Sequence, residues 1–423
     1  MAHLLVIESW VGSMSHLLPR AITEGGHRFT FLTRDLNHYL RSTPEEHSHP
    51  LLAAANILTA DTNDLQTVLA HVERLHPTLT FDGVLSSCDY YLPTVAAVAA
   101  HLGLPGPEPD NVLAACRKDL TRRRLAAAAV PGPRFALCAD WPETAAAARE
   151  IGYPLVVKPV DLCAGMLVRK ITNEDELAAA HQALNDFPEN ARGQLREPTV
   201  LLEELLTGPE VSVETVSFDG EVHVVGVTGK NIGGAPAFIE TGHLFPADLG
   251  PAPATAVTET AVAALKALGL DHVVAHTEIK LTPEGPRVVE VNPRPAGNRI
   301  TELVRRVTGV DLTAACVDVA LGHRPNLTAR ATDAASAAIA FLLPERDGVV
   351  TTVEGVDTVR QDPAVVELNL GTLKGREVRR ATNNNAYLGH VMTVDTNGAA
   401  GLRAEQLLRQ LTLRYEQGPA VPA

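Results

Sequence analysis

The sequence has few cysteines and no paired arrangement of them. Its 423 residues include five cysteines, and none of them forms a CxxC pair. The apolar run His3–Ile7 near the start is too short for the core of a signal peptide. Scattered thiols without an export signal are typical of a reducing compartment. We therefore expect reduced cysteines and a cytoplasmic protein.

Long apolar runs and excess positive charge are also missing. No stretch approaches the roughly 20 apolar residues that a helix needs to cross a bilayer. Lys and Arg total 36 against 50 Asp and Glu, which gives a formal net charge of −14. This surplus of negative charge opposes attraction to nucleic-acid phosphates and anionic lipids. The sequence therefore predicts no nucleic-acid partner and no membrane partner.

Several common catalytic and nucleotide-binding signatures are absent. There is no GxGxxG fingerprint, no GxxxxGK[ST] phosphate loop and no arrangement typical of a Ser/His/Asp nucleophile. A dinucleotide-binding fingerprint and a P-loop are thereby excluded. The length and the hydrophobic content of 45% are too large for one ordinary core, so we expect several subdomains with a cleft between them.

The order of apolar runs and turns predicts an α/β protein with four regions. The N-terminal region, residues 1–110, alternates short strands with helices and ends at a Pro/Gly-rich linker. The small lobe covers residues 111–205, and the strand-rich large lobe covers residues 206–330. Residues 331–423, the C-terminal region, form an accessory subdomain of short strands and a final helix.

Within these regions the pattern predicts individual elements. One basic helix is expected over residues 111–130, and an apolar strand over residues 153–160. Asp219 and Gly220 separate two alternating runs and predict a hairpin turn. A final amphipathic helix is expected over residues 403–415.

Two carboxylates follow each other in the stretch HTEIKLTPEGPRVVEVNPR. Glu278 and Glu290 lie on strands joined by a PEGP turn, so they can face each other, and Asn292 shares the face of Glu290. Carboxylates with an amide oxygen suit magnesium. A solvated hairpin is the alternative for a lone glutamate pair, but the order E-x-N-x-R favours a metal site. Arg294, again on that face, could hold a carboxylate or phosphate, or form a surface salt bridge.

Two lysines raise the question of an anionic ligand. Lys158 stands in the apolar run VVKPV, where an ammonium costs free energy unless an anion meets it. Lys118 offers a second cation, although neighbouring arginines also allow a solvated helix face. Two lysines directed at one cleft suit a triphosphate.

Two further segments suggest ligand contacts. In LEELLTGPE, Glu204 and Leu205 could offer backbone groups to an adenine edge and Glu210 could accept ribose hydroxyls. The glycine-rich stretch 226–249 carries Glu240 and His243 and predicts a substrate loop, with an ordinary surface loop as the competing interpretation.

Taken in order, these features resemble the ATP-grasp superfamily across roughly residues 111–321. The set is Lys118, Lys158, EELLTGPE, Lys230, Glu278, Glu290, Asn292 and Arg294. Within it, HTEIK with His276, ETGH at residues 240–243 and NPRPAG resemble the L-amino-acid ligases and carnosine-synthase-like enzymes more than biotin carboxylase. The resemblance implies an ATP-grasp fold with a Rossmann-like N-terminal α/β domain and a C-terminal accessory subdomain. It also implies a homodimer.

The resemblance implies roles for individual residues. ATP phosphates would be contacted by Lys118, Lys158 and Lys230, the adenine pocket would be formed by Glu203, Glu204 and Leu205, and ribose would be held by Glu210. Magnesium, with manganese as an alternative, would be carried by Glu278, Glu290 and Asn292. Catalysis would involve Arg294, His276 and Lys230, and the amino-acid substrate would be held by Glu240, His243 and Arg294.

The implied reaction is ATP-dependent ligation of a carboxylate, expected to be that of an amino acid, to an amine through an acyl phosphate, with release of ADP and phosphate. Alternatives are a biotin-carboxylase-like activity, a phosphoribosylamine–glycine ligase-like activity and a regulatory nucleotide-binding protein without turnover. No A-M-K-M-like biotin carrier motif is present. One departure concerns the loop VDLCAGMLV after Lys158, which has a single glycine, Gly165, where many relatives have a longer glycine-rich flap.

Overall fold

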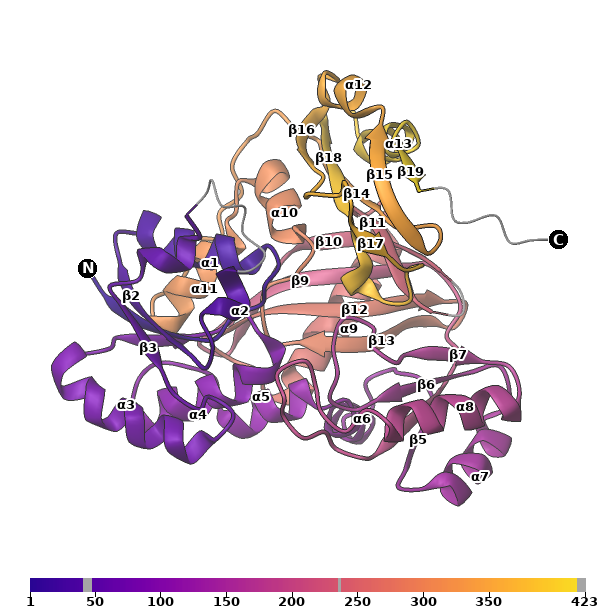
Figure 1. Ribbon diagram of the computed structural model, residues 1–423. Coiled ribbons are helices and arrows are strands. Elements are labelled where there is room, and N and C mark those ends of the chain that lie inside the picture. The colour runs from indigo at the N-terminus through magenta and orange to yellow at the C-terminus, as the bar shows by residue number, and fades with distance from the viewer. Residues whose placement is uncertain (41–47, 235–236, 417–423) are drawn as a thin grey trace.

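The computed structural model describes residues 1–40, 48–234 and 237–416. Positions 235–236 of the predicted substrate loop and 417–423 of the C-terminal region lie outside the described residues. The architecture is mixed α/β, as predicted, with a long central sheet to which both the large lobe and the C-terminal region contribute strands (Figure 1). Among the described residues, no helix is both long and apolar enough to cross a membrane. The five cysteines are free thiols.

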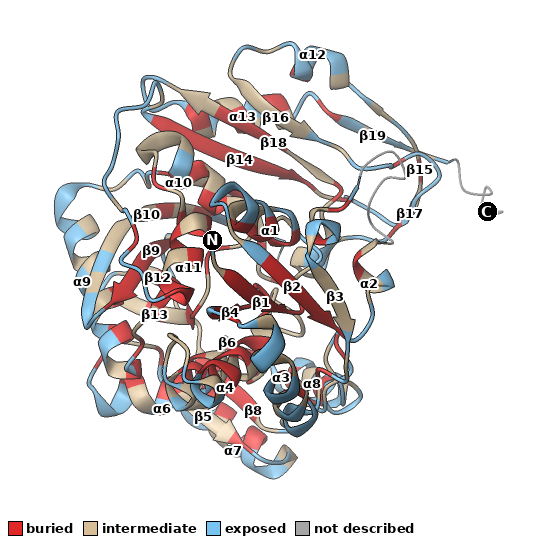
Figure 2. Cartoon of the chain, turned by 90° about the vertical axis from the view of Figure 1, so that its left-hand side faces the viewer, coloured by how far each residue is buried: buried red, intermediate tan, exposed pale blue. Residues whose placement is uncertain are grey.

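The N-terminal region is a parallel sheet of order β3-β2-β1-β4. Its strands are β1 (His3–Ile7), β2 (Arg28–Thr33), β3 (Asn56–Thr59) and β4 (Gly83–Leu85). Its helices are α1 (Met14–Glu24), α2 (Asn37–Leu40), η1 (Pro50–Ala53), α3 (Leu65–Leu79), η2 (Asp89–Tyr91) and α4 (Leu92–Leu102). Every residue of β1 is buried, as a continuous apolar strand covered on both faces requires (Figure 2).

The small lobe has an antiparallel sheet of order β5-β8-β6-β7. Its strands are β5 (Phe135–Cys138), β6 (Leu155–Pro159), β7 (Arg169–Ile171) and β8 (Val200–Glu204). Its helices are α5 (Pro109–Cys116), α6 (Lys118–Ala127), α7 (Trp141–Ile151) and α8 (Glu174–Asn185). The single basic helix predicted over residues 111–130 is wrong, because Arg117 is extended, with φ −106° and ψ 109°, and separates α5 from α6. The break places Lys118 at the start of α6.

The large lobe contributes the first strands of an eight-stranded sheet of order β13-β12-β9-β10-β11-β14-β18-β16. They are β9 (Glu210–Phe218), β10 (Glu221–Gly233), β11 (Ile239–Phe245), β12 (Val273–Thr282) and β13 (Gly285–Asn292), with helices α9 (Pro251–Leu268), α10 (Ile300–Thr308) and α11 (Leu312–Ala320). The predicted β9–β10 hairpin turn is confirmed. Asp219 and Gly220 have φ values of 53° and 78°, the left-handed pair of a two-residue hairpin.

The C-terminal region is continuous with this sheet. Strands β14 (Ser336–Leu342), β16 (Val365–Asn369) and β18 (Gly389–Asp395) extend it beyond β11. A smaller sheet holds β15 (Gly348–Glu354), β17 (Glu377–Val378) and β19 (Thr412–Tyr415), accompanied by α12 (Val356–Arg360), η3 (Asn384–Ala386) and α13 (Ala400–Leu408). The final helix predicted over residues 403–415 ends at Leu408, and the chain continues as β19. The four-region division itself stays a prediction.

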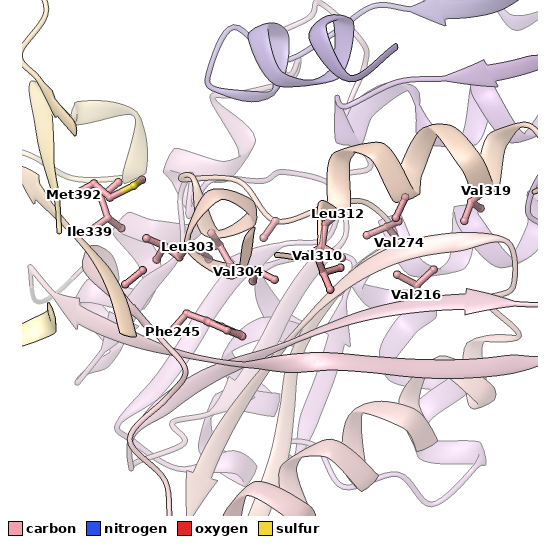
Figure 3. Packing of buried hydrophobic residues seen from close by; sticks show 14 of the residues in the cluster. Val216, Phe245, Val274, Leu303, Val304, Val310, Leu312, Val319, Ile339 and Met392 are labelled. Atoms are coloured by element: carbon pink, nitrogen blue, oxygen red, sulfur yellow. The ribbon is translucent and has the colours of Figure 1, made fainter. Parts of the chain in front are cut away.

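The largest core lies where the helices α10 and α11 pack on this sheet. Figure 3 shows side chains from both helices meeting side chains of the strands, among them Leu303, Val304, Leu312, Val319, Val216, Val274, Phe245, Ile339 and Met392. Strands from the large lobe and the C-terminal region share this core, and β11 pairs with β14 in antiparallel fashion.

Candidate active site

The two predicted metal carboxylates are direct cross-strand neighbours. Glu278 of β12 pairs with Glu290 of β13, as predicted from the hairpin. Both side chains are largely buried, at 16% and 26% exposure, so the alternative of a fully solvated hairpin does not hold. Lys230 Nζ lies 2.6 Å from Glu278 Oε1, and Lys118 Nζ lies 2.8 Å from Glu290 Oε1. Each of the two predicted metal carboxylates therefore meets a lysine predicted to bind phosphate.

Lys230 is the centre of a three-carboxylate cluster. In addition to Glu278, its Nζ lies 2.8 Å from Glu240 and 3.5 Å from Glu210. Burial opposes its charge, but the surrounding carboxylates outweigh burial and hold the pKa of Lys230 well above its ordinary value. Lys280 also reaches Glu210, at 3.1 Å. The cluster brings residues of β9, β10, β11 and β12 to one face of the sheet.

His276 is held between two acids. Its Nδ1 lies 3.0 Å from Glu214 Oε2, and its Nε2 lies 3.3 Å from Glu278 Oε1. Burial lowers the pKa of His276, but Glu214 and Glu278 outweigh burial and raise it to about 9. The predicted catalytic histidine is thus a cation that orients Glu278. Glu214 was missed, although period-two alternation on β9 places it on the same face as Glu210.

Opposing effects also set the ionisation of Glu278. Burial raises its pKa, but Lys230 and His276 outweigh burial and lower the pKa to about 2. The carboxylate is therefore ionised throughout the neutral range, as a metal ligand needs to be.

A β-bulge directs Glu240 to the same cluster. The β10–β11 register shifts between Asn231 and Ile232, so Lys230 pairs with His243 while Ile232 pairs with Glu240. The extra residue places Glu240 and His243 on one face, with His243 Nε2 3.2 Å from Glu240 Oε2. Both ring nitrogens of His243 are buried and lack a partner with hydrogen-bond geometry.

The buried ammonium of Lys158 meets an anion, as expected, but this anion belongs to the protein itself. Lys158 Nζ lies 2.6 Å from Glu203 Oε2, and Arg122 Nε donates to Glu203 Oε1 at 2.6 Å. All three side chains are buried. Burial raises the pKa of Glu203, but Arg122 and Lys158 outweigh it, so the carboxylate stays charged. Glu203, predicted for the adenine pocket, is the internal anion of the small-lobe sheet.

The other predicted adenine residues, Glu204 and Leu205, lie at the end of β8, whereas the predicted ribose residue Glu210 belongs to the Lys230 cluster. Glu204 Oε2 accepts from Arg134 Nε at 2.8 Å, and Glu204 Oε1 accepts from Arg287 at 3.0 Å, which joins the small lobe to β13. Leu205 directly follows β8, and Glu210 begins β9.

A cavity of about 330 Å³ lies where the N-terminal region, the small lobe and the end of β13 meet. Its lining includes Lys118, Glu290 and Asn292 together with Asp161, Leu162 and Cys163 of the loop after β6. Lys118 Nζ also donates to Leu162 O at 2.6 Å. The cavity therefore brings together one predicted phosphate ligand and two predicted metal ligands.

Arg294 lies beside this cavity and contacts the N-terminal region. Its Nε donates to Asp89 Oδ1 at 2.7 Å, and Trp10 Nε1 donates to Asp89 Oδ2 at 2.8 Å. Burial lowers and Asp89 raises the pKa of Arg294, with a net increase. Asp89 was missed, because the 205 positions between the two residues leave no local signal.

The donor set Glu278, Glu290 and Asn292 consists of oxygen ligands, which fits magnesium. In the described part of the chain there is no group of three or more His, Cys, Asp or Glu residues that could hold a metal ion.

Family comparisons agree with this arrangement. Residues 151–302 match the ATP-grasp domain, residues 22–106 the ATP-grasp N-terminal domain, and residues 340–416 the L-amino acid ligase C-terminal domain 2. The chain belongs to the ATP-grasp superfamily. The predicted resemblance to L-amino-acid ligases is thereby confirmed.

Individual relatives of this ATP-grasp protein support the same placement. It is 29% identical over 370 residues to the uncharacterized protein y4rH of Sinorhizobium fredii, covering 84% of this chain and 75% of that one. It is 30% identical over 311 residues to carnosine synthase 1 of Gallus gallus, covering 69% of this chain but only 33% of that one. The crystal structure of L-amino acid ligase from Bacillus licheniformis matches with a TM-score of 0.80 and 22% identity, over 99% of both chains. This structural match shows the fold.

Proposed function

We propose that the protein is an ATP-dependent ligase that joins the carboxylate of an amino acid to an amine through an acyl phosphate. One observation carries the proposal: the two cross-strand carboxylates, Glu278 and Glu290, are each paired with a lysine from another element. A lysine ammonium can exchange a carboxylate for a phosphate, and the released carboxylate can then take a divalent cation. The pairs therefore suit a site that receives metal and polyphosphate together.

Under this proposal the nucleotide takes its phosphate contacts from Lys118, Lys158 and Lys230. The adenine and ribose contacts predicted for Glu203, Glu204, Leu205 and Glu210 remain part of the proposal. Lys158 differs from the other two lysines, because Glu203 already satisfies its charge. Its ammonium would have to share that anion or leave it to reach a phosphate.

Magnesium, with manganese as an alternative, would be held by Glu278, Glu290 and Asn292. When bound, the metal would neutralise charge that develops on the transferred phosphoryl group. His276 keeps Glu278 oriented, and Lys118 and Lys230 hold the anionic groups in place around it.

The amino-acid substrate would be bound by Arg294 through its carboxylate and by Glu240 and His243 near its ammonium. A carboxylate oxygen attacks the γ-phosphorus of ATP, the bond to the bridging oxygen breaks, and ADP leaves. The amine nitrogen then attacks the carbonyl carbon, inorganic phosphate leaves, and the surplus proton passes to solvent. We include a homodimer in the proposal on the basis of the family resemblance.

The test supplies hydroxylamine in place of the amine and screens single amino acids with ATP and magnesium. Hydroxamate formed with equal ADP supports the acyl phosphate, whereas stoichiometric AMP would refute it. Reactions without amino acid and reactions of the Glu290→Gln variant serve as controls. If ATP binds but no amino acid yields hydroxamate, the non-catalytic regulatory alternative is favoured instead.

A further inference from the structure

Glu240 is held at three points by residues outside its own hairpin. Its backbone N–H donates to Asn384 Oδ1 at 3.0 Å, and its carbonyl oxygen accepts from the Tyr387 hydroxyl at 3.0 Å. Asn298 Nδ2 donates to Glu240 Oε2 at 2.5 Å. Asn384 and Tyr387 belong to the C-terminal region, so that region fixes both backbone groups of a residue in the large lobe.

The same short segment also reaches the small lobe. Asn384 N donates to Ala164 O at 3.3 Å, in the loop after β6. A Cβ added at Gly165 would lie 3.6 Å from Phe238 O and 3.9 Å from Asn384 Nδ2, so the loop is in van der Waals reach of the residue before β11 and of η3. The preceding residues of that loop, including Asp161 and Cys163, line the 330 Å³ cavity. One residue of the C-terminal region thus links the cavity loop to Glu240.

Tyr387 is fixed independently of its hydroxyl. Its ring stacks on Phe341 of β14, with centroids 4.3 Å apart and an interplanar angle of 22°, and Phe341 meets the ring of His243 edge-on at 5.5 Å. Removal of the hydroxyl alone would leave this stack in place. Burial raises the pKa of Tyr387, so the hydroxyl stays protonated as a donor.

The backbone is strained at Asn298, the residue that contacts the Glu240 carboxylate. Asn298 and Arg299 have φ values of 50° and 61°, the left-handed region that non-glycine residues rarely adopt. Arg299 NH2 lies 2.9 Å from Glu367 Oε1 of β16, another strand of the C-terminal region. Strained residues persist only where surrounding contacts determine them, and here those contacts come both from Glu240 and from Tyr387 and Glu367 of the C-terminal region.

We propose that Asn384 and Tyr387 are positioning residues of the amino-acid site, which hold Glu240 ready for the substrate ammonium. Asn384 also ties Glu240 to the loop after β6 and so couples amino-acid binding to nucleotide binding. The inference rests on the proposed function, because it takes Glu240 as a substrate-binding residue. It also makes the C-terminal region a part of the active site.

The test compares Tyr387→Phe and Asn384→Ala with Asn385→Ala. Asn385 lies in the same turn, is exposed, and serves as the matched control. Tyr387→Phe is expected to raise KM for the amino acid about tenfold while kcat changes less than twofold, since it removes one of the three hydrogen bonds that hold Glu240. Asn384→Ala is expected to raise the same KM and to weaken ATP binding several-fold. Asn385→Ala is expected to match the wild type.

A calorimetric titration of ATP and of the amino acid with each intact protein keeps the test independent of turnover. Unchanged amino-acid affinity in both variants, or a lower melting temperature with unchanged KM, would overturn the inference. If the wild type binds amino acid and Tyr387→Phe binds it less well, the inference stands even where no product forms and the ligase proposal fails. If the wild-type protein with ATP present binds no amino acid, the positioning role is refuted.

Discussion

Buried acids in the N-terminal region and in the large lobe are stabilised in different ways. Glu8, directly after β1, accepts from Arg34 N at 2.6 Å, Thr62 Oγ1 at 2.7 Å, Thr33 Oγ1 at 3.0 Å and the Tyr39 hydroxyl. These donors are neutral backbone and hydroxyl groups, and they come from β2, from the segments that follow β2 and β3, and from α2. The acids around Lys230 instead pair with long, flexible cations.

Burial of an acid therefore does not by itself indicate a ligand site. A carboxylate bonded by hydroxyl and backbone donors has a permanent internal partner, so it joins elements of the fold. A carboxylate bonded by lysine can exchange that cation for a metal when the lysine finds another anion. By this criterion we expect Glu8 to be structural, and we propose that Glu278 and Glu290 belong to a ligand site.

Two buried histidines show the same contrast. Burial and the neighbouring His16 lower the pKa of His49 to about 4. His276, beside Glu214 and Glu278, has its pKa raised to about 9. A neighbouring carboxylate, and not burial, decides which histidine is charged at neutral pH.

The largest expected effect is on turnover in Glu290→Gln. The substitution keeps the shape but removes the charge that we assign to the metal, so turnover should fall by two or more orders of magnitude. Initial rates of phosphate release with magnesium and ATP measure this. Unfolding in urea should be little changed, because Lys118 keeps its bond to Leu162 O. Wild-type turnover in the variant would refute the assignment of Glu290 as a metal ligand.

Glu8→Ala tests the acid that we class as structural. Its removal takes the shared acceptor away from three buried hydroxyls and from the partly buried Arg34 N–H, and we expect a loss of about 3 kcal/mol in the free energy of unfolding. Urea denaturation measures the change, and ATP affinity under native conditions is expected to stay the same. An altered ATP affinity in a fully folded variant would mean that Glu8 is not purely structural.

Lys158→Met tests a lysine that has a permanent partner inside the protein and is also proposed to bind ATP. We expect about tenfold weaker ATP binding together with about 2 kcal/mol lower stability, because Glu203 loses one of its two buried cations. Calorimetry and urea unfolding separate the two effects, with exposed Lys266→Met of α9 as control. Lower stability with unchanged ATP affinity would make Lys158 a structural residue.

The smallest expected effect is on the pH dependence of stability, and it involves His49. Its Nδ1 accepts from Leu51 N at 3.1 Å, which a protonated ring cannot do, and its ring lies 4.4 Å from that of His16. The pKa of His49 in the folded state is below its ordinary value. Neutral His49 therefore contributes to the free energy of unfolding above about pH 6.5, and this contribution is lost as the pH falls toward 4. His49→Asn keeps an acceptor at this helix cap and should flatten the stability profile between those values. Identical thermal melts of variant and wild type across that range would contradict this.

Local patterns in the sequence were sufficient for several features. Asp219 and Gly220 predicted the β9–β10 turn, because its backbone conformation depends on those two residues. The PEGP turn and the alternation of the flanking strands predicted that Glu278 would face Glu290. The ordered motifs predicted the ATP-grasp family, since each motif is read within a short segment.

Only the tertiary structure decided which partners these residues have. Glu203 meets Lys158 because β8 lies beside β6, and Glu240 meets Asn384 across 144 positions because β14 extends the sheet beyond β11. Periodicity gives the face of a strand on which a side chain lies, but it does not give the neighbouring strand. Strand order in the sheet determines which charges meet, and that order follows from long-range packing rather than from any local stretch of sequence.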